Sequence, residues 1–169
     1  MTSGETDYAV WTCDGLTKVL RTSPRRQQPR RTVRICAARN EYESAQVVIR
    51  AGARPLENIS VACGDLVGPR GNRISARHIG LYRVAYVPVP GYETGCPDPL
   101  PPLTPFAVPP HTNQPVWVTV YVPRETPAGE YRGLLTISEG RVRIARVPMA
   151  LRVWEFALPD TPTSRTAFA

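Results

Sequence analysis

Alternation of apolar and polar positions is the clearest pattern along the chain. In VWVTVYV (116–122), four valines fall on one side of an extended backbone, whereas Trp117, Thr119 and Tyr121 fall on the other. Similar runs occur at 32–37, 44–50, 58–63, 78–93, 130–138 and 141–156. The pattern predicts an all-β fold, a β-sandwich of about seven to nine mostly antiparallel strands.

The last two runs predict a hairpin with an irregular second strand. Glu139–Gly140 joins them, and glycine supplies the positive φ that a tight turn requires. The apolar positions change from even to odd numbering between Ile144 and Val147, so we expect a bulge near Ala145–Arg146. Pro148 cannot donate to a ladder, which predicts an edge position or a place beside the bulge.

Helical spacing is confined to DGLTKVLR (14–21). Leu16, Val19 and Leu20 have the spacing of one helix face, and Asp14 is in position to cap the first turn. The sequence therefore predicts at most one short helix, of about two turns.

A proline-rich segment interrupts the strand pattern between residues 88 and 115, and it holds ten of the 19 prolines. Prolines fix φ and reduce the entropy lost on ordering, so we expect an ordered surface loop. Loops of this length are usually functional or pack on another domain. The predicted ligand or interdomain contacts are in or just after this loop: Tyr92, Phe106, His111, Asn113 and Trp117.

Composition indicates one globular domain. The chain has 169 residues, of which 42% are hydrophobic and 21% charged. No apolar run approaches the ~20 residues of a membrane span. The start, MTSGETDYAVW, lacks a basic segment followed by a hydrophobic one. We therefore expect no membrane partner and a cytoplasmic protein, unless a leader has been removed.

The net charge of +7 raises the question of nucleic-acid binding. The arginines are scattered except in RRQQPRR (25–31), and no aromatic residues interleave with that run, as single-strand binding requires. The run is typical of a solvated basic loop, so nucleic acid is not the expected partner.

The cysteines do not have the spacing of a metal or redox site. Cys13, Cys36, Cys63 and Cys96 are 23, 27 and 33 positions apart, without a C-x-x-C pair. We predict no metal and no cofactor. Disulfides stay open, with three connectivities available to four cysteines.

No catalytic residue is identifiable. A two-carboxylate hydrolase needs an acid and its partner roughly 5–9.5 Å apart. Glu41 and Glu43 lie beside Arg39 at a strand entrance, which favours a structural turn. His78 and His111 have no neighbours at metal-ligand spacing, and the G-x-S-x-G elbow of serine hydrolases does not occur.

Three segments together resemble a known family: ARNEYESAQVVI (38–49), NQPVWVTVYVPRETPAGEYRGLLTI (113–137) and VPMALRVWEFALPDTPTSRTAF (147–168). In this order they are similar to the N-terminal β-sandwich domain of glycoside hydrolases like family 123. The resemblance implies a following (β/α)8 barrel, in which an adjacent Asp–Glu pair acts on a 2-acetamido sugar such as a β-N-acetylgalactosaminide. A barrel needs about 250 residues, and this sequence contains no Asp–Glu dipeptide.

The expected organisation is therefore a non-catalytic accessory sandwich (1–157) and a linker (158–169) toward a missing catalytic barrel. Arg39, Asn40 and Glu41 form a structural box in this interpretation. We expect Arg39 to close a turn against Glu41 or Glu43. Glu41 is expected to be partly buried and hydrogen-bonded, because an unpaired buried charge costs several kcal/mol.

Two other functions compete with the accessory role. A free-standing carbohydrate-binding module predicts a row of exposed coplanar aromatic rings or a polar groove. An arginine-rich polyanion-binding domain predicts distant arginines that converge on one face, with binding that weakens steeply as salt rises.

Overall fold

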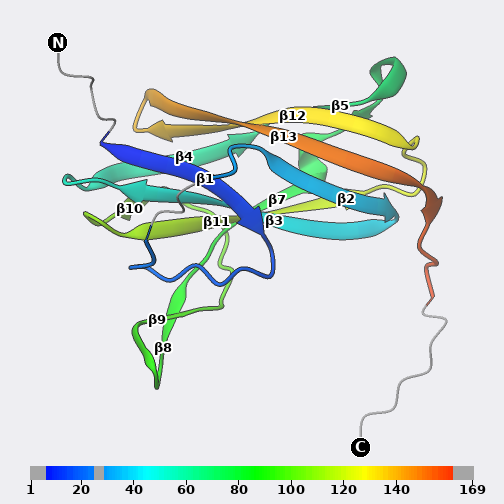
Figure 1. Ribbon diagram of the computed structural model, residues 1–169. Helices are drawn as coiled ribbons and strands as arrows, with labels where there is room; N and C mark the ends of the chain where they lie inside the picture. Colours follow the sequence, from blue (N-terminus) through cyan, green and yellow to red (C-terminus); the bar gives the residue numbers. More distant parts are fainter. Residues whose placement is uncertain (1–6, 25–28, 162–169) are drawn as a thin grey trace, which may run out of the picture.

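The computed structural model describes residues 7–24 and 29–161, which form two β-sheets packed face to face (Figure 1). The first sheet has the order β1 (Tyr8–Asp14), β3 (Glu41–Ala51), β11 (Asn113–Val122), β7 (Ile79–Arg83). The second has the order β10 (Phe106–Val108), β4 (Leu56–Cys63), β12 (Gly129–Glu139), β13 (Val142–Ala157), β2 (Val33–Arg39). All neighbours in these two orders are antiparallel except β13 and β2. The predicted all-β sandwich is confirmed.

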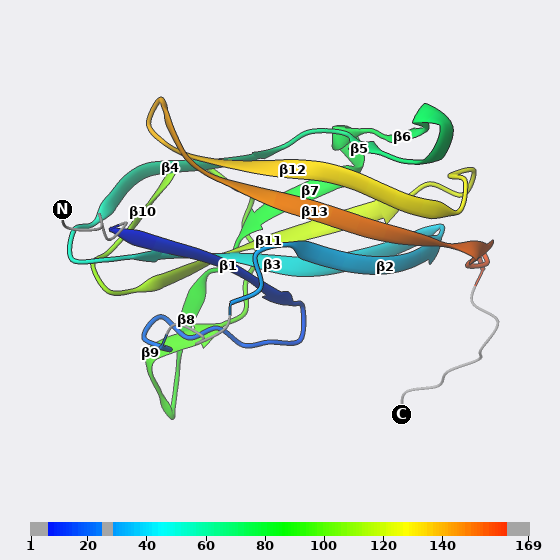
Figure 2. The same cartoon turned by 45° about the horizontal axis from the view of Figure 1, so that its top comes forward.

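Short elements decorate this frame. Strands β5 (Leu66–Val67) and β6 (Arg73–Ile74) extend the second sheet beside β12. Strands β8 (Tyr86–Val89) and β9 (Tyr92–Pro97) form a separate hairpin that projects from the sandwich (Figure 2). Two 3-10 turns, η1 (Pro69–Gly71) and η2 (Ala76–His78), complete the described elements. Within the described ranges, no helix has the length and apolarity that crossing a lipid bilayer requires.

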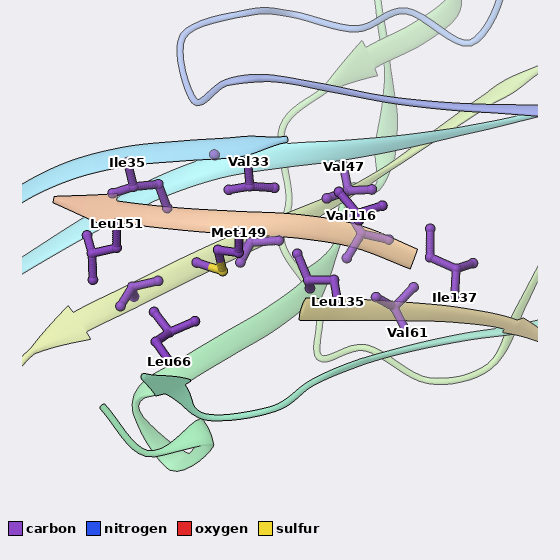
Figure 3. Close-up of a cluster of buried hydrophobic side chains, with 14 of the residues drawn as sticks. Val33, Ile35, Val47, Val61, Leu66, Val116, Leu135, Ile137, Met149 and Leu151 are labelled. Carbon is purple, nitrogen blue, oxygen red and sulfur yellow. The ribbon is translucent and has the colours of Figure 1, made fainter. Parts of the chain in front are cut away.

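The alternation in β11 builds the centre of the core. The four valines at 116, 118, 120 and 122 are fully buried between the sheets. They belong to one buried cluster with Val47 of β3 and with Leu135 and Leu151 of the facing strands β12 and β13; Figure 3 shows Val116 of this cluster beside Val47. Burying one aliphatic side chain of this kind stabilises the fold by roughly 1.5–3 kcal/mol. The period-two pattern gives the sheet one apolar face, and burial of that face stabilises the packing of the two sheets.

The predicted bulge in β13 is present. Ile137 of β12 pairs with Ala145, whereas its neighbour Ser138 pairs with Arg143, so Ile144 is the extra residue. It lies directly before the predicted place. The Tyr8 hydroxyl donates to the Ile144 carbonyl, which joins β1 of the first sheet to the bulge in the second.

The turn of this hairpin and its proline also follow the prediction. Gly140 has φ 57°, and Glu139 pairs with Val142 across the turn. Pairing of β13 with β2 begins at Met149, so Pro148 lies where β13 has a neighbour on one side only. A missing N–H is tolerated there because no ladder needs it.

The predicted short helix at 14–21 is wrong. Strand β1 continues to Asp14, and a turn follows. The Asp14 carboxylate does act as a cap, accepting from the Leu16 N–H at 3.1 Å and the Thr17 hydroxyl at 2.7 Å, but no helix extends from it. Val19 is buried against β1 and β3, whereas Leu16 is 95% exposed, so these apolar residues do not share one face.

The segment 88–115 is more regular than the predicted loop, since β9 and β10 lie within it. Residues 25–28 of the predicted basic loop and 162–169 of the predicted linker lie outside the described residues, as do the first six residues of the chain. All four cysteines lie within the described ranges, and no disulfide joins them there. Burial raises the pKa of the Cys63 thiol to about 11, which keeps it protonated at neutral pH.

Candidate functional site

The structure does not bring the five predicted contact residues into one cluster. Phe106 is a core residue of β10, and Asn113 is fully buried at the start of β11. His111 is exposed in a tight turn at φ 57°. Tyr92 lies on the projecting hairpin, and Trp117 lies on the outer face of the first sheet, opposite the buried valines.

Tyr92 lines a groove between the projecting hairpin and the segment after β1. The groove has a volume of about 590 Å³ and is shared with Glu93 and Thr94. The Arg21 guanidinium lies 4.2 Å from the centre of the Tyr86 ring, and the Tyr86 hydroxyl donates to the Val19 carbonyl at 2.8 Å. Desolvation raises the pKa of Tyr86 to about 12, so this hydroxyl stays protonated at neutral pH and can donate. These contacts attach the hairpin to the sandwich.

Trp117 packs beneath the turn that follows β1. A Cβ atom added to Gly15 would lie 3.1 Å from the Trp117 ring, so the backbone there rests close to the indole. The indole N–H donates to the Thr119 hydroxyl at 3.0 Å, and that hydroxyl is 2.9 Å from Ser44. Trp117 is therefore committed to contacts within the domain.

On the outer face of the first sheet, Tyr42 and His78 join Tyr121 in an aromatic group that was predicted only in part. Tyr42 is 70% exposed, and its ring centre lies 4.6 Å from that of Tyr121 on the neighbouring strand. The His78 ring is 5.8 Å from Tyr121. A hollow of about 190 Å³ lies over this face, lined also by Tyr82 and Arg77. The alternation in 116–122 predicted that the Tyr121 side chain faces outward. The rings beside it lie there because of the order of the strands in the sheet, which the alternation does not predict.

Asn40 lies at the centre of a polar cluster at one end of the sandwich. It occupies the turn between β2 and β3 at φ 60°, and its N–H donates to the Val122 carbonyl at 2.7 Å. Its side-chain amide donates to the Leu158 carbonyl at 3.1 Å and to the Asp160 carboxylate at 2.9 Å. Its amide oxygen accepts from the Tyr121 hydroxyl at 2.9 Å.

Two arginines complete this cluster. The Leu158 N–H donates to the Arg39 carbonyl at 2.8 Å, and the Arg39 guanidinium donates to the carbonyl of Glu155. Arg124 donates to the Leu158 carbonyl at 3.1 Å and pairs with Asp160 at 3.2 Å. We call Arg39, Asn40 and Arg124, with the residues that they hold, the exit clamp, because they fix the segment that leaves the sandwich.

Glu41 is half-buried, and its carboxylate accepts from the Ala38 N–H at 2.5 Å, as predicted. The predicted pairing of Arg39 with Glu41 or Glu43 is wrong. Arg39 belongs to β2, whose neighbour is β13, so its guanidinium reaches Glu155 instead. The Arg39 Nε is buried, and it has no hydrogen-bond partner among residues 7–24 and 29–161.

A two-point ion pair between Arg54 and Glu139 lies at the other end of the sandwich. Both Glu139 carboxylate oxygens accept from Arg54 at 2.8 Å, and one also accepts from the Glu57 N–H at 2.9 Å. These bonds, first of all those from Arg54, lower the pKa of Glu139 to about 2. Glu139 is thus ionised at neutral and mildly acidic pH and joins the β3–β4 connection to the β12–β13 turn. In the described part of the chain, no three His, Cys, Asp or Glu residues could hold a metal ion.

The exit clamp gives a direct mutational prediction. Asn40→Ala should lower the free energy of unfolding by about 2 kcal/mol, because alanine is strained in the left-handed region and the amide hydrogen bonds are lost. Asn40→Gly should lose only about half of this, since glycine adopts positive φ freely. Urea unfolding measures both values, and amide exchange at Leu158 should accelerate in both variants. Equal losses in the two variants would contradict the backbone part of this explanation.

The two sheets form a β-sandwich domain, and the exit clamp holds the segment that follows β13 in a fixed position. A family model, the glycoside hydrolase 123 N-terminal domain, matches residues 17–139. The chain belongs to this family. A search of curated protein sequences found no match.

Solved structures extend the likeness in fold. A family 123 glycoside hydrolase from Clostridium perfringens, studied for glycolipid glycan hydrolysis, has a TM-score of 0.78 and 14% identity, with 91% of this chain covered. The chain spans 28% of the length of that enzyme. AvmM, which catalyses macrocyclization in alchivemycin A biosynthesis, matches at a TM-score of 0.50 and 10% identity, covering 94% of this chain and 93% of its own. At these identities both likenesses concern the fold alone.

Proposed function

We propose that this chain is the non-catalytic N-terminal accessory domain of a glycoside hydrolase, and that it packs on and orients a catalytic (β/α)8 barrel. In this proposal residues 1–157 are the sandwich, and residues 158–169 lead to the barrel. Family membership and the 28% share of the Clostridium perfringens enzyme support a larger parent protein. The observation that carries the orienting role is the exit clamp.

The clamp suits an orienting role because it fixes the direction in which the chain leaves. Domains joined by a free linker move relative to each other by default. Here Leu158 is held through both its N–H and its carbonyl, and Asp160 is held through its carboxylate. A domain that begins shortly after Asp160 would start from a defined point and direction, which reduces the orientations open to it.

We propose a glycan with a terminal 2-acetamido sugar, of the β-N-acetylgalactosaminide type, as the substrate of the parent enzyme. The support is the resemblance of the three segments to family 123 domains and the membership of the chain in that family. The carboxylates of this chain do not need to take part. The Glu41, Glu139 and Asp160 side chains are all committed to contacts within the domain.

A carbohydrate-binding module is the second candidate. The observation that favours it is the group of rings on the outer face of the first sheet, where Tyr42, Tyr82 and Tyr121 surround a hollow beside Arg77. Aromatic faces and charged donors of this kind can hold a sugar ring. Against this, the Tyr121 hydroxyl donates to Asn40, and the Tyr42 and Tyr121 rings are tilted by 30° to each other rather than coplanar.

The assay is hydrolysis of 4-nitrophenyl N-acetyl-β-D-galactosaminide by the complete gene product and by the 169-residue chain alone. We expect turnover by the complete gene product and none by the shorter chain, with the β-D-galactoside that lacks the acetamido group as the matched poor substrate. Hydrolysis by the shorter chain would overturn the accessory role. Saturable binding of N-acetylgalactosamine to it, with no glycosidase domain in the gene product, would establish the second candidate instead.

A further inference from the structure

Four of the nine large exposed apolar side chains of the described residues lie in or beside the segments that form the chain exit. Leu16, Val67, Val89, Leu100 and Val142 are dispersed over other elements. The remaining four are Tyr42, Trp154, Phe156 and Leu158, and they include every exposed aromatic side chain of this set. We call these four residues the exit collar. Large apolar side chains that are exposed around one end of a domain suit a site of protein contact.

The exit clamp explains why the collar residues lie together. Ala157 pairs with Arg39, so Phe156 and Leu158 flank the point where β13 meets the end of β2. The turn at Asn40 then carries the chain into the first sheet, where Tyr42 follows two residues later. In Figure 1 the ends of β13 and β2 and the start of β3 meet at the end of the sandwich from which the chain leaves.

The collar residues are exposed on both sheets at this end of the sandwich. Phe156 is 59% exposed beside the second sheet, and Tyr42 projects from the outer face of the first. Stacked sheets lie about 10 Å apart, so one sugar ring could not cover both residues. The surface of a second protein domain is large enough to cover both residues.

We infer that the exit collar is the docking surface for the domain that follows Asp160 in the same polypeptide, whose contact face would be apolar. This inference rests on the proposed accessory function and names the surface that it uses. Connection through the clamped exit makes the contact intramolecular, and a short tether gives an effective concentration in the millimolar range. A small patch can therefore be occupied without a large intrinsic affinity.

Hydroxyl-radical footprinting of the complete gene product tests the inference. The labelling rate of each collar aromatic is compared with that of the same residue in urea-unfolded protein, and Leu16 and Val142 are the exposed references. We expect Tyr42, Trp154 and Phe156 to be labelled at least about fivefold more slowly than in the unfolded protein, with Leu16 and Val142 within about twofold, because an interface core excludes water. Unprotected collar residues would overturn the inference.

Variants separate docking from the proposed function. Tyr42→Ser and Phe156→Ser should restore labelling of the remaining collar residues in the complete gene product, whereas Val142→Ser, on the distant β12–β13 turn, should leave the protection unchanged. An active glycosidase with an unprotected collar would refute docking and leave the accessory role standing. A gene product without a glycosidase domain would refute both. Protection that requires added N-acetylgalactosamine would refute docking and identify the collar as a sugar site.

Discussion

Replacement of Tyr131 by alanine should lower the free energy of unfolding by about 3–5 kcal/mol, which is the usual cost of truncating a fully buried aromatic side chain. Tyr131 of β12 is completely buried in the core, and its ring fills the space beneath the connection to η1. A Cβ atom added to Gly68 would lie 2.4 Å from a Tyr131 ring carbon, so the backbone there is shaped around the ring. Urea unfolding of the purified chain measures the loss.

Tyr131→Phe is the matched control for packing. The Tyr131 hydroxyl donates to the Pro127 carbonyl at 2.8 Å, and the phenylalanine variant removes that bond while it keeps the ring. We expect a loss of about 1 kcal/mol, the net value of an ordinary hydrogen bond. A phenylalanine variant as unstable as the alanine variant would show that the hydroxyl, rather than the ring, is the main source of stability.

The fold could be predicted from the sequence wherever one face of a strand is buried and the other is not. Strand β11 is the clearest case, because its valines alternate with partly exposed residues. Strand β1 was missed because its burial does not alternate: Trp11, Thr12 and Cys13 are all buried. The turn after β1 covers the outer side of this strand, so its apolar and polar residues do not alternate. The helical spacing of residues 14–21 was then the clearest pattern in this part of the sequence.

The candidate site could be predicted only in its local part. The segment around Asn40 was interpreted as a structural corner, because charged residues at a strand entrance need nearby partners. The structure has a turn there, but Arg39 has a different partner from the predicted one. What the corner holds could not be predicted. Leu158 and Asp160 are 118 and 120 residues away from Asn40 in sequence, and a parallel pairing of β13 with β2 brings them there. The docking interpretation depends on that long-range pairing.

Asn113 was a candidate contact because it follows the proline-rich segment, yet its buried side chain is used inside the domain. Its amide group donates to the Leu20 and Ser23 carbonyls, both at 2.9 Å, and its oxygen accepts from Arg50 at 3.0 Å. These bonds hold the segment after β1 against the first sheet. That segment includes Val19, which packs against Trp11.

Asn113→Ala should therefore lower the free energy of unfolding by about 3 kcal/mol, because three hydrogen bonds are lost and their partners are left partly buried. The same change should accelerate proteolysis between residues 15 and 24. Asn72→Ala is the control: Asn72 also donates to a carbonyl, that of Pro69, at 2.8 Å, but at an exposed site, and we expect a loss below about 1 kcal/mol. A ligand-contact role for Asn113 would instead give unchanged stability with lost binding, the opposite of what its complete burial predicts.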